Sequence, residues 1–135
     1  DKNQLAFLSD QRPTSGGYFN NLGVLRSAGY ITYPTQGRAA LTDRGRTVAS
    51  SPDTPTTTES LHRQIREKVS RSQWRILEVL ISEFPNALTK DDLASRSDQK
   101  STSGGYFNNL GMLRTLGLID YPSPGMAVAL PILFL

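Results

Sequence analysis

The sequence contains no cysteine and a single histidine, His62. Disulfides and thiolate metal sites are therefore excluded, and one imidazole provides no zinc or haem ligand set, so we expect no cofactor and no metal. Every apolar run is well short of the roughly 18 residues that cross a membrane. The chain starts with Asp-Lys-Asn-Gln rather than with a basic patch before an apolar stretch. We therefore expect no signal peptide, no membrane partner and a cytoplasmic location.

Residue sets that support catalysis are also missing. No Gly-Lys-Ser/Thr is present, so the sequence has no phosphate-binding loop of the P-loop type. One histidine in a polar region cannot complete a set of serine, histidine and carboxylate. The sequence therefore predicts a protein that is not an enzyme.

The sequence does contain an internal repeat. The run Thr14-Ser-Gly-Gly-Tyr-Phe-Asn-Asn-Leu-Gly23 recurs 88 positions later as Thr102-Ser-Gly-Gly-Tyr-Phe-Asn-Asn-Leu-Gly111. Of the 30 positions from Leu5 to Pro34, 21 are identical in the second copy. The chain therefore holds two copies of one structural unit, each of roughly 60 residues, near the lower limit for independent folding.

The second copy contains three predicted helices and a β-hairpin. Residues 71–84 carry apolar side chains at helical spacing and end before Pro85. A short second helix begins after Thr89, and a third helix, capped by Thr102 or Ser103, reaches about residue 116 and ends at Gly117. Residues 118–121 and 127–130 alternate around the turn at 122–125, which predicts a hairpin.

The first copy repeats this order without its first helix. We predict helices over residues 2–11 and 14–28, and strands over 30–33 and 39–41. The counterpart of the helix 71–84 would lie before residue 1. Three explanations stay open: the chain is a fragment of a longer protein, a second molecule donates the helix, or the helix over residues 59–69 covers the exposed core with Leu61, Ile65 and Val69.

This pattern resembles the winged helix-turn-helix fold, and the run Leu41-Thr-Asp-Arg-Gly-Arg46 resembles the end of the wing in MarR-type regulators. The resemblance implies a mainly α fold with small β-hairpin wings and a role as a bacterial DNA-binding transcription regulator. It divides the chain into a truncated unit (1–50), a Ser/Thr/Pro-rich linker (51–58), a connecting helix (59–70) and a complete unit (71–135).

A weaker resemblance links the second copy to C-terminal segments of bacterial P-loop ATPases of HerA-like or mobile-element type. The residues that carry it are Trp74, Phe84-Pro85, Asp92-Leu93-Ala94, the run from Ser103 to Ile119, and the closing run from Ala129 to Leu135. It implies that the units guide a DNA-acting motor.

The third helix of each copy is the predicted DNA-reading element. A helical projection of the first copy puts Tyr18, Leu22 and Leu25 on the buried side and small polar residues on the other. Asparagine pairs bidentately with adenine in the major groove, so Asn20 and Asn108 are the candidates for reading bases. The helix N-termini suit phosphate oxygens, and the candidates there are Thr14, Ser15, Gly16, Ser103 and Gly104.

Charge favours the first copy as the DNA-binding one. Residues 1–50 carry six Lys and Arg against three Asp, whereas the rest of the chain is balanced. Arg38 lies at the first hairpin tip, and Arg44 and Arg46 follow the hairpin, where they could contact phosphates. The second hairpin has no cation.

Two alternatives stay open. Asn20 and the arginines could be solvated surface residues. Four apolar residues beside the polar face could instead form a protein–protein or homodimer contact: Phe19, Val24, Phe107 and Met112. The function predicted first is duplex DNA binding, and the alternative is an interaction or oligomerisation module of a DNA-acting assembly.

Overall fold

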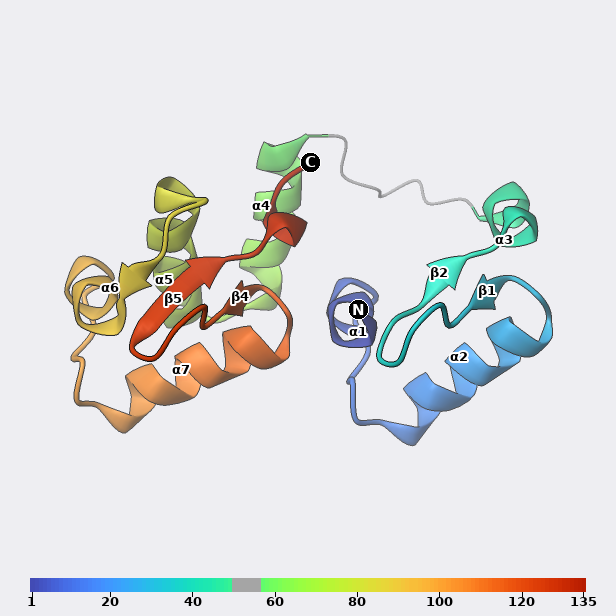
Figure 1. Cartoon of the computed structure of the whole chain (residues 1–135), viewed down its shortest axis with the longest axis horizontal. Helices are drawn as coiled ribbons and strands as arrows, with labels where there is room; N and C mark the ends of the chain where they lie inside the picture. Colours follow the sequence, from blue (N-terminus) through green and yellow to red (C-terminus); the bar gives the residue numbers. More distant parts are fainter. Residues whose placement is uncertain (50–56) are drawn as a thin grey trace. The chain divides into compact units, whose positions relative to one another are not determined.

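The computed structural model describes residues 1–49 and 57–135, which form two compact units, one in each range (Figure 1). Both units are mainly helical with small antiparallel strand pairs. Within the described ranges, no helix is long and apolar enough to span a bilayer. The predicted linker at 51–58 lies outside the described residues except for its last two positions.

Helices α5 (Arg71–Glu83), α6 (Lys90–Arg96) and α7 (Gly104–Thr115) of the second unit begin where local sequence predicts. The side-chain oxygens of Ser70, Thr89 and Ser103 each accept a hydrogen bond of 3.1 Å from a backbone N–H in the first turn. These caps satisfy donors that have no partner inside the helix. The three predicted helices of the second copy are thus present.

The second unit closes its core with α5. Strands β3 (Leu88–Thr89), β4 (Ile119–Asp120) and β5 (Met126–Ala129) form an antiparallel sheet in the order β3-β5-β4. Helix α5 contacts α6, α7 and β5. Its fully buried residues are Ile76, Leu77 and Leu80, and they meet Leu93, Leu110 and Leu113 in the same core. One amphipathic helix therefore covers the apolar sides of two helices and a strand.

Helix α4 (Thr58–Lys68) also belongs to the second unit. Leu61 and Ile65 are buried, and α4 contacts the short 3₁₀ helix η1 (Pro131–Leu133). His62 Nε2 lies 2.6 Å from the carbonyl oxygen of Leu133. The apolar stripe that we considered as a cover for the first unit is thus used inside the second unit, where it holds the apolar C-terminal segment.

The first unit contains α1 (Lys2–Leu8), α2 (Gly16–Ser27), β1 (Ile31–Thr32), β2 (Ala40–Leu41) and α3 (Asp43–Val48). Ile31 pairs with Leu41 and Thr32 with Ala40, as Ile119 pairs with Ala129 and Asp120 with Val128 in the second unit. Figure 1 shows the same path for α2, β1 and β2 as for α7, β4 and β5. The repeat in sequence is therefore a repeat in structure.

The predicted burial of Leu25 is wrong. Leu25 is 41% exposed, whereas Leu113, at the equivalent position of α7, is fully buried. The described part of the first unit has no helix in the place of α5, so the apolar stripe of α2 is covered only at Tyr18 and Leu22.

Candidate nucleic-acid interface

The N-terminus of α2 is built by the repeated motif. Ser15 is the N-cap, and its Oγ accepts a hydrogen bond of 3.1 Å from the backbone N–H of Tyr18. Ser103 does the same for Tyr106 in α7. Each serine thus uses its oxygen within its own helix, and its hydroxyl proton remains able to donate to a phosphate oxygen. Thr14 is exposed next to this cap.

The outer faces of α2 and α7 carry small side chains, and no other element packs against their glycines. At Gly16 and Gly23, no atom beyond the backbone of the same helix lies within 4 Å of the place where a Cβ would stand, and Gly104 and Gly111 are equally open. Asn20 and Asn108 are exposed on these faces. Packing inside the unit therefore does not explain glycine at these positions, although glycine inside a helix costs about 1 kcal/mol relative to alanine.

Exposed apolar residues border this face in both units, as predicted. Phe19 is 51% exposed and Phe107 is 50% exposed. Val24 and Met112 are also exposed. The aromatic residue before each phenylalanine points inward, and the Tyr18 hydroxyl donates a hydrogen bond of 2.6 Å to the Lys2 carbonyl oxygen. This bond ties α2 to the start of α1.

A groove beside the first hairpin tip brings the start of α1 and the face of α2 together. We call it the tip groove; it has a volume of about 580 Å³. Its lining residues are Asp1, Lys2, Asn3, Pro13, Phe19, Gln36, Gly37 and Arg38. Burial and the nearby Arg38 guanidinium lower the pKa of the Asp1 α-amino group. Arg38 is thus placed beside the phenylalanine of the candidate recognition helix.

Lys2 from the tip groove and a further cation, Arg26, stack on the Tyr33 ring. Lys2 Nζ lies 3.7 Å from the centre of the Tyr33 ring, and Arg26 Cζ lies 4.6 Å from it. Neither Lys2 nor Arg26 is among the site residues predicted from the sequence. The signal was present, because the second copy has the same three residue types at the same 88-residue spacing. Lys90 and Arg114 stack on Tyr121 in the same way.

The balance of charge in this region differs between the two units. In the second unit, Met126 replaces Arg38, while Asp91 and Asp92 replace Asn3 and Gln4. Arg114 also forms an ion pair of 3.5 Å with Asp120, whose counterpart in the first unit is the uncharged Thr32. The first unit therefore presents a basic surface where the second unit presents an acidic or neutral one.

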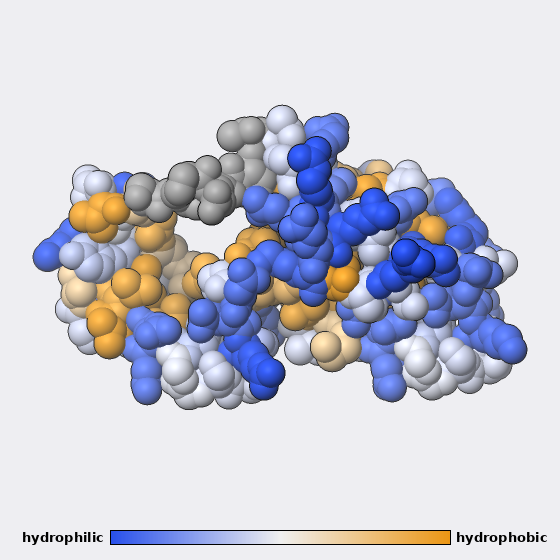
Figure 2. Space-filling model, turned by 180° about the vertical axis from the view of Figure 1, so that it is seen from behind, coloured by the Kyte–Doolittle hydropathy of each residue, from blue (hydrophilic) through white to orange (hydrophobic). Residues whose placement is uncertain are grey.

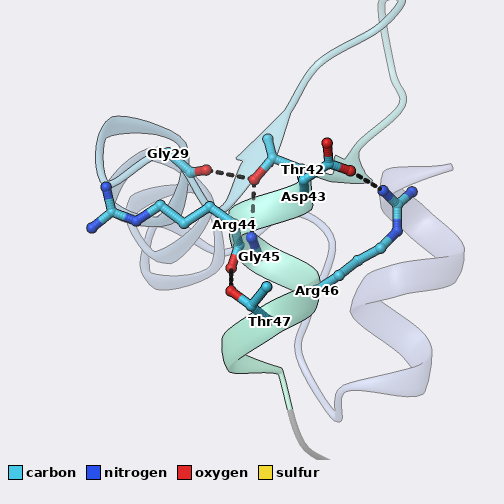
Figure 3. Close-up of polar contacts among 7 residues, drawn as sticks. All are labelled: Gly29, Thr42, Asp43, Arg44, Gly45, Arg46 and Thr47. Carbon is cyan, nitrogen blue, oxygen red and sulfur yellow. Dashed lines mark hydrogen bonds and ion pairs between the residues drawn. The ribbon is translucent and has the colours of Figure 1, made fainter.

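Arg44 and Arg46 lie at the other end of the hairpin from Arg38. They belong to α3, which the sequence analysis did not predict, and their side chains point to opposite sides of it (Figure 3). Arg44 stacks on the Tyr30 ring at 5.2 Å, and Arg46 forms an exposed ion pair of 3.1 Å with Asp43. The structure thus brings Arg38 to the α2 face and leaves these two arginines at the hairpin base.

Helix α3 exists because of a cap and a close contact. The Thr42 Oγ1 accepts a hydrogen bond of 3.0 Å from the Gly45 N–H and donates one of 2.5 Å to the Gly29 carbonyl oxygen (Figure 3). A Cβ at Gly45 would overlap the carbonyl oxygen of Tyr30. The run that resembles the end of a MarR-type wing therefore has a structural role here.

The candidate interface consists of helix N-termini, asparagine side chains, and lysine and arginine side chains. In the described ranges, no group of three or more His, Asp or Glu side chains could hold a metal ion. Comparison of the chain with protein-family models, curated proteins and solved structures finds no match.

Proposed function

We propose that both units are winged helix-turn-helix modules and that the first unit binds duplex DNA. In this proposal α2 enters the major groove with Asn20 at a base edge, and the hairpin tip is the wing. The observation that carries the proposal is the junction of two surfaces: the open glycine and asparagine face of α2 and the basic tip groove with Lys2 and Arg38.

The open face fits DNA for a steric reason. A helix in the major groove approaches base edges and phosphates closely, and side chains at Gly16 and Gly23 would hold it away. The cations beside the face supply the part of the affinity that depends on phosphate and salt. Arg26 and Lys2, fixed against Tyr33, lose less side-chain freedom on binding than free side chains would.

The test is a titration of the full chain with labelled mixed-sequence duplex DNA at about 50 and 200 mM salt, read by fluorescence anisotropy. We expect binding that weakens as salt rises. Arg38→Ala should reduce the affinity several-fold and the salt slope by about 1. Arg46→Ala removes the same charge from the hairpin base and is the matched control, so it should have the smaller effect.

Asn20→Ala separates base reading from phosphate contact. It should reduce discrimination between duplex sequences by about 1–3 kcal/mol while leaving the salt slope unchanged. The proposal would be refuted by no binding at either salt concentration, or by an Arg38→Ala variant that binds as the parent does.

The second unit favours a protein contact. Phe107 and Met112 are half exposed beside the open Gly111, and residues 122–126 of the hairpin turn include no Lys or Arg. We propose self-association through α7 as this unit's function. Sedimentation should show that Met112→Glu weakens it more than Val24→Glu in the first unit, and a chain that stays monomeric at all concentrations would exclude it.

A further inference from the structure

The first unit has an apolar groove on the side of its hairpin where the second unit carries α5. The groove has a volume of about 240 Å³. It is lined only by apolar residues from α1, α2 and the two strands: Leu5, Leu22, Leu25, Ile31, Ala39, Ala40 and Leu41. Figure 2, the view from behind, shows apolar surface gathered on this unit at the left. The groove shares no residue with the tip groove.

The second unit shows what such a groove holds. The counterparts of Leu5, Leu25 and Leu41 are Leu93, Leu113 and Ala129, and each is 2% exposed or less. Helix α5 covers them by contacting α6, α7 and β5, the counterparts of α1, α2 and β2. In the first unit the same three positions are between 40% and 45% exposed. These three positions thus differ in burial where the second unit has α5 and the described part of the first unit has no counterpart of it.

A second observation concerns the strand edge. In the second unit, β3 follows α5 and pairs with the outer edge of β5, with Leu88 opposite Ala127. The first unit has a sheet of two strands in its described part, so the edge at Ala39 has no such strand. The backbone hydrogen bond next to this edge is present in both units. The Lys2 N–H donates to the Gly37 carbonyl oxygen, and the Lys90 N–H donates to the Gly125 carbonyl oxygen, each at 2.9 Å.

We infer that the groove of the first unit binds an amphipathic helix of the α5 type, followed by a short extended segment that pairs with β2. The helix carries aliphatic side chains at the spacing of Ile76, Leu77 and Leu80. The long described helices of this chain do not supply it, because the apolar stripes of α4 and α5 are buried in the second unit. The occupant is therefore a helix from outside residues 57–135.

The test places a second copy of residues 70–88 directly before Asp1 of the full chain, which restores the spacing between α5 and α6 in the second unit. The control carries the same addition with the three added aliphatic positions changed to serine, equivalent to I76S, L77S and L80S. Amide hydrogen exchange in α2 is the readout, because covering Leu22 and Leu25 stabilises that helix. We expect exchange at least about tenfold slower with the aliphatic addition and unchanged with the serine control.

Three results would overturn the inference. One is unchanged exchange with the aliphatic addition, and another is equal slowing by both additions. The third is a dimer of the unaltered chain in light scattering whose α2 amides are already protected, since the occupant would then be a second copy. None of these readouts depends on DNA binding, so failure here is distinct from failure of the proposed function.

Discussion

Leu25 and Leu113 occupy the same position in two copies of one helix, so their replacement by alanine isolates the effect of the α5 cover. Leu113 is fully buried. Leu113→Ala removes apolar burial and leaves a cavity below α5, which should cost about 3 kcal/mol of the second unit's free energy of unfolding. Leu25 is 41% exposed and borders an open groove. Leu25→Ala loses only partial burial and creates no closed cavity, so about 1 kcal/mol is expected from the first unit.

The stability of each unit can be measured separately. Trp74 is the only tryptophan and lies on α5, so its fluorescence reports the second unit. Amide hydrogen exchange in α2 reports the first unit. Equal costs for the two substitutions would refute the reasoning, because they would mean that Leu25 is already covered in solution. A Leu113→Ala cost below about 1 kcal/mol would refute the assigned role of α5.

Three further predictions use urea titration, amide exchange in α2 and DNA binding. Burial raises the pKa of Tyr106 from 10.0 to about 12. The folded unit holds the neutral phenol, so the stability that this group contributes is full below about pH 10 and is lost as the pH rises toward 12. Tyr106→Phe should therefore reduce the fall in stability at high pH in urea titrations, while Tyr121, whose pKa is also raised by burial, keeps part of it. Gly45→Ala should destabilise the first unit and speed exchange in α2, because the added Cβ overlaps the Tyr30 carbonyl oxygen; normal exchange would contradict this. Gly23→Ala should instead slow exchange in α2, because the position is open and alanine raises the stability of the helix by about 1 kcal/mol. The same substitution should weaken DNA binding, and tighter binding would count against the proposed interface.

The helices of the second unit could be predicted because their signals are local. Ser70, Thr89 and Ser103 each precede a helical run and cap it through their own side chains. The turn glycines are equally local, since Gly37 and Gly125 adopt φ of 77° and 78°, which other residues adopt only with strain. These features depend on neighbours a few residues away, and sequence reasoning finds them without knowledge of the fold.

The exposure of Leu25 could not be predicted in this way. A helical projection gives the direction of a side chain but not whether another element covers it. Leu25 and Leu113 have similar neighbours in sequence, and their burial differs where α5 packs on α7 and no described helix packs in the same way on α2. The repeat shows no counterpart of α5 within residues 1–49, but the effect on the burial of Leu25 had to be read from the structure.

The helix that carries Arg44 and Arg46 after the first hairpin was not predicted, for a related reason. The run 41–46 is too short to show a period, and its Thr42 and Gly45 signal a helix cap as well as a strand end. Because Thr42 caps α3, Arg44 and Arg46 lie on a helix instead of in an irregular segment after the hairpin. Lys2 was missed because it lies outside the 30-residue stretch of highest identity, although its counterpart Lys90 is the same residue.

Comparison of the two copies sorts their identical residues into those that packing inside each unit explains and those that it does not. Tyr18 and Tyr106 are explained by burial and by their bonds to a lysine carbonyl, and Leu22 and Leu110 by the core. The identities left over lie on the outer faces of α2 and α7, where glycine, asparagine and phenylalanine are exposed and the glycines meet no other element. In the proposed function, this shared face is the one that each unit turns toward its partner. The charge around the face is the reason for proposing DNA as the partner of the first unit alone, because a cation such as Arg38 favours a phosphate and Met126, its counterpart in the second unit, has no charge.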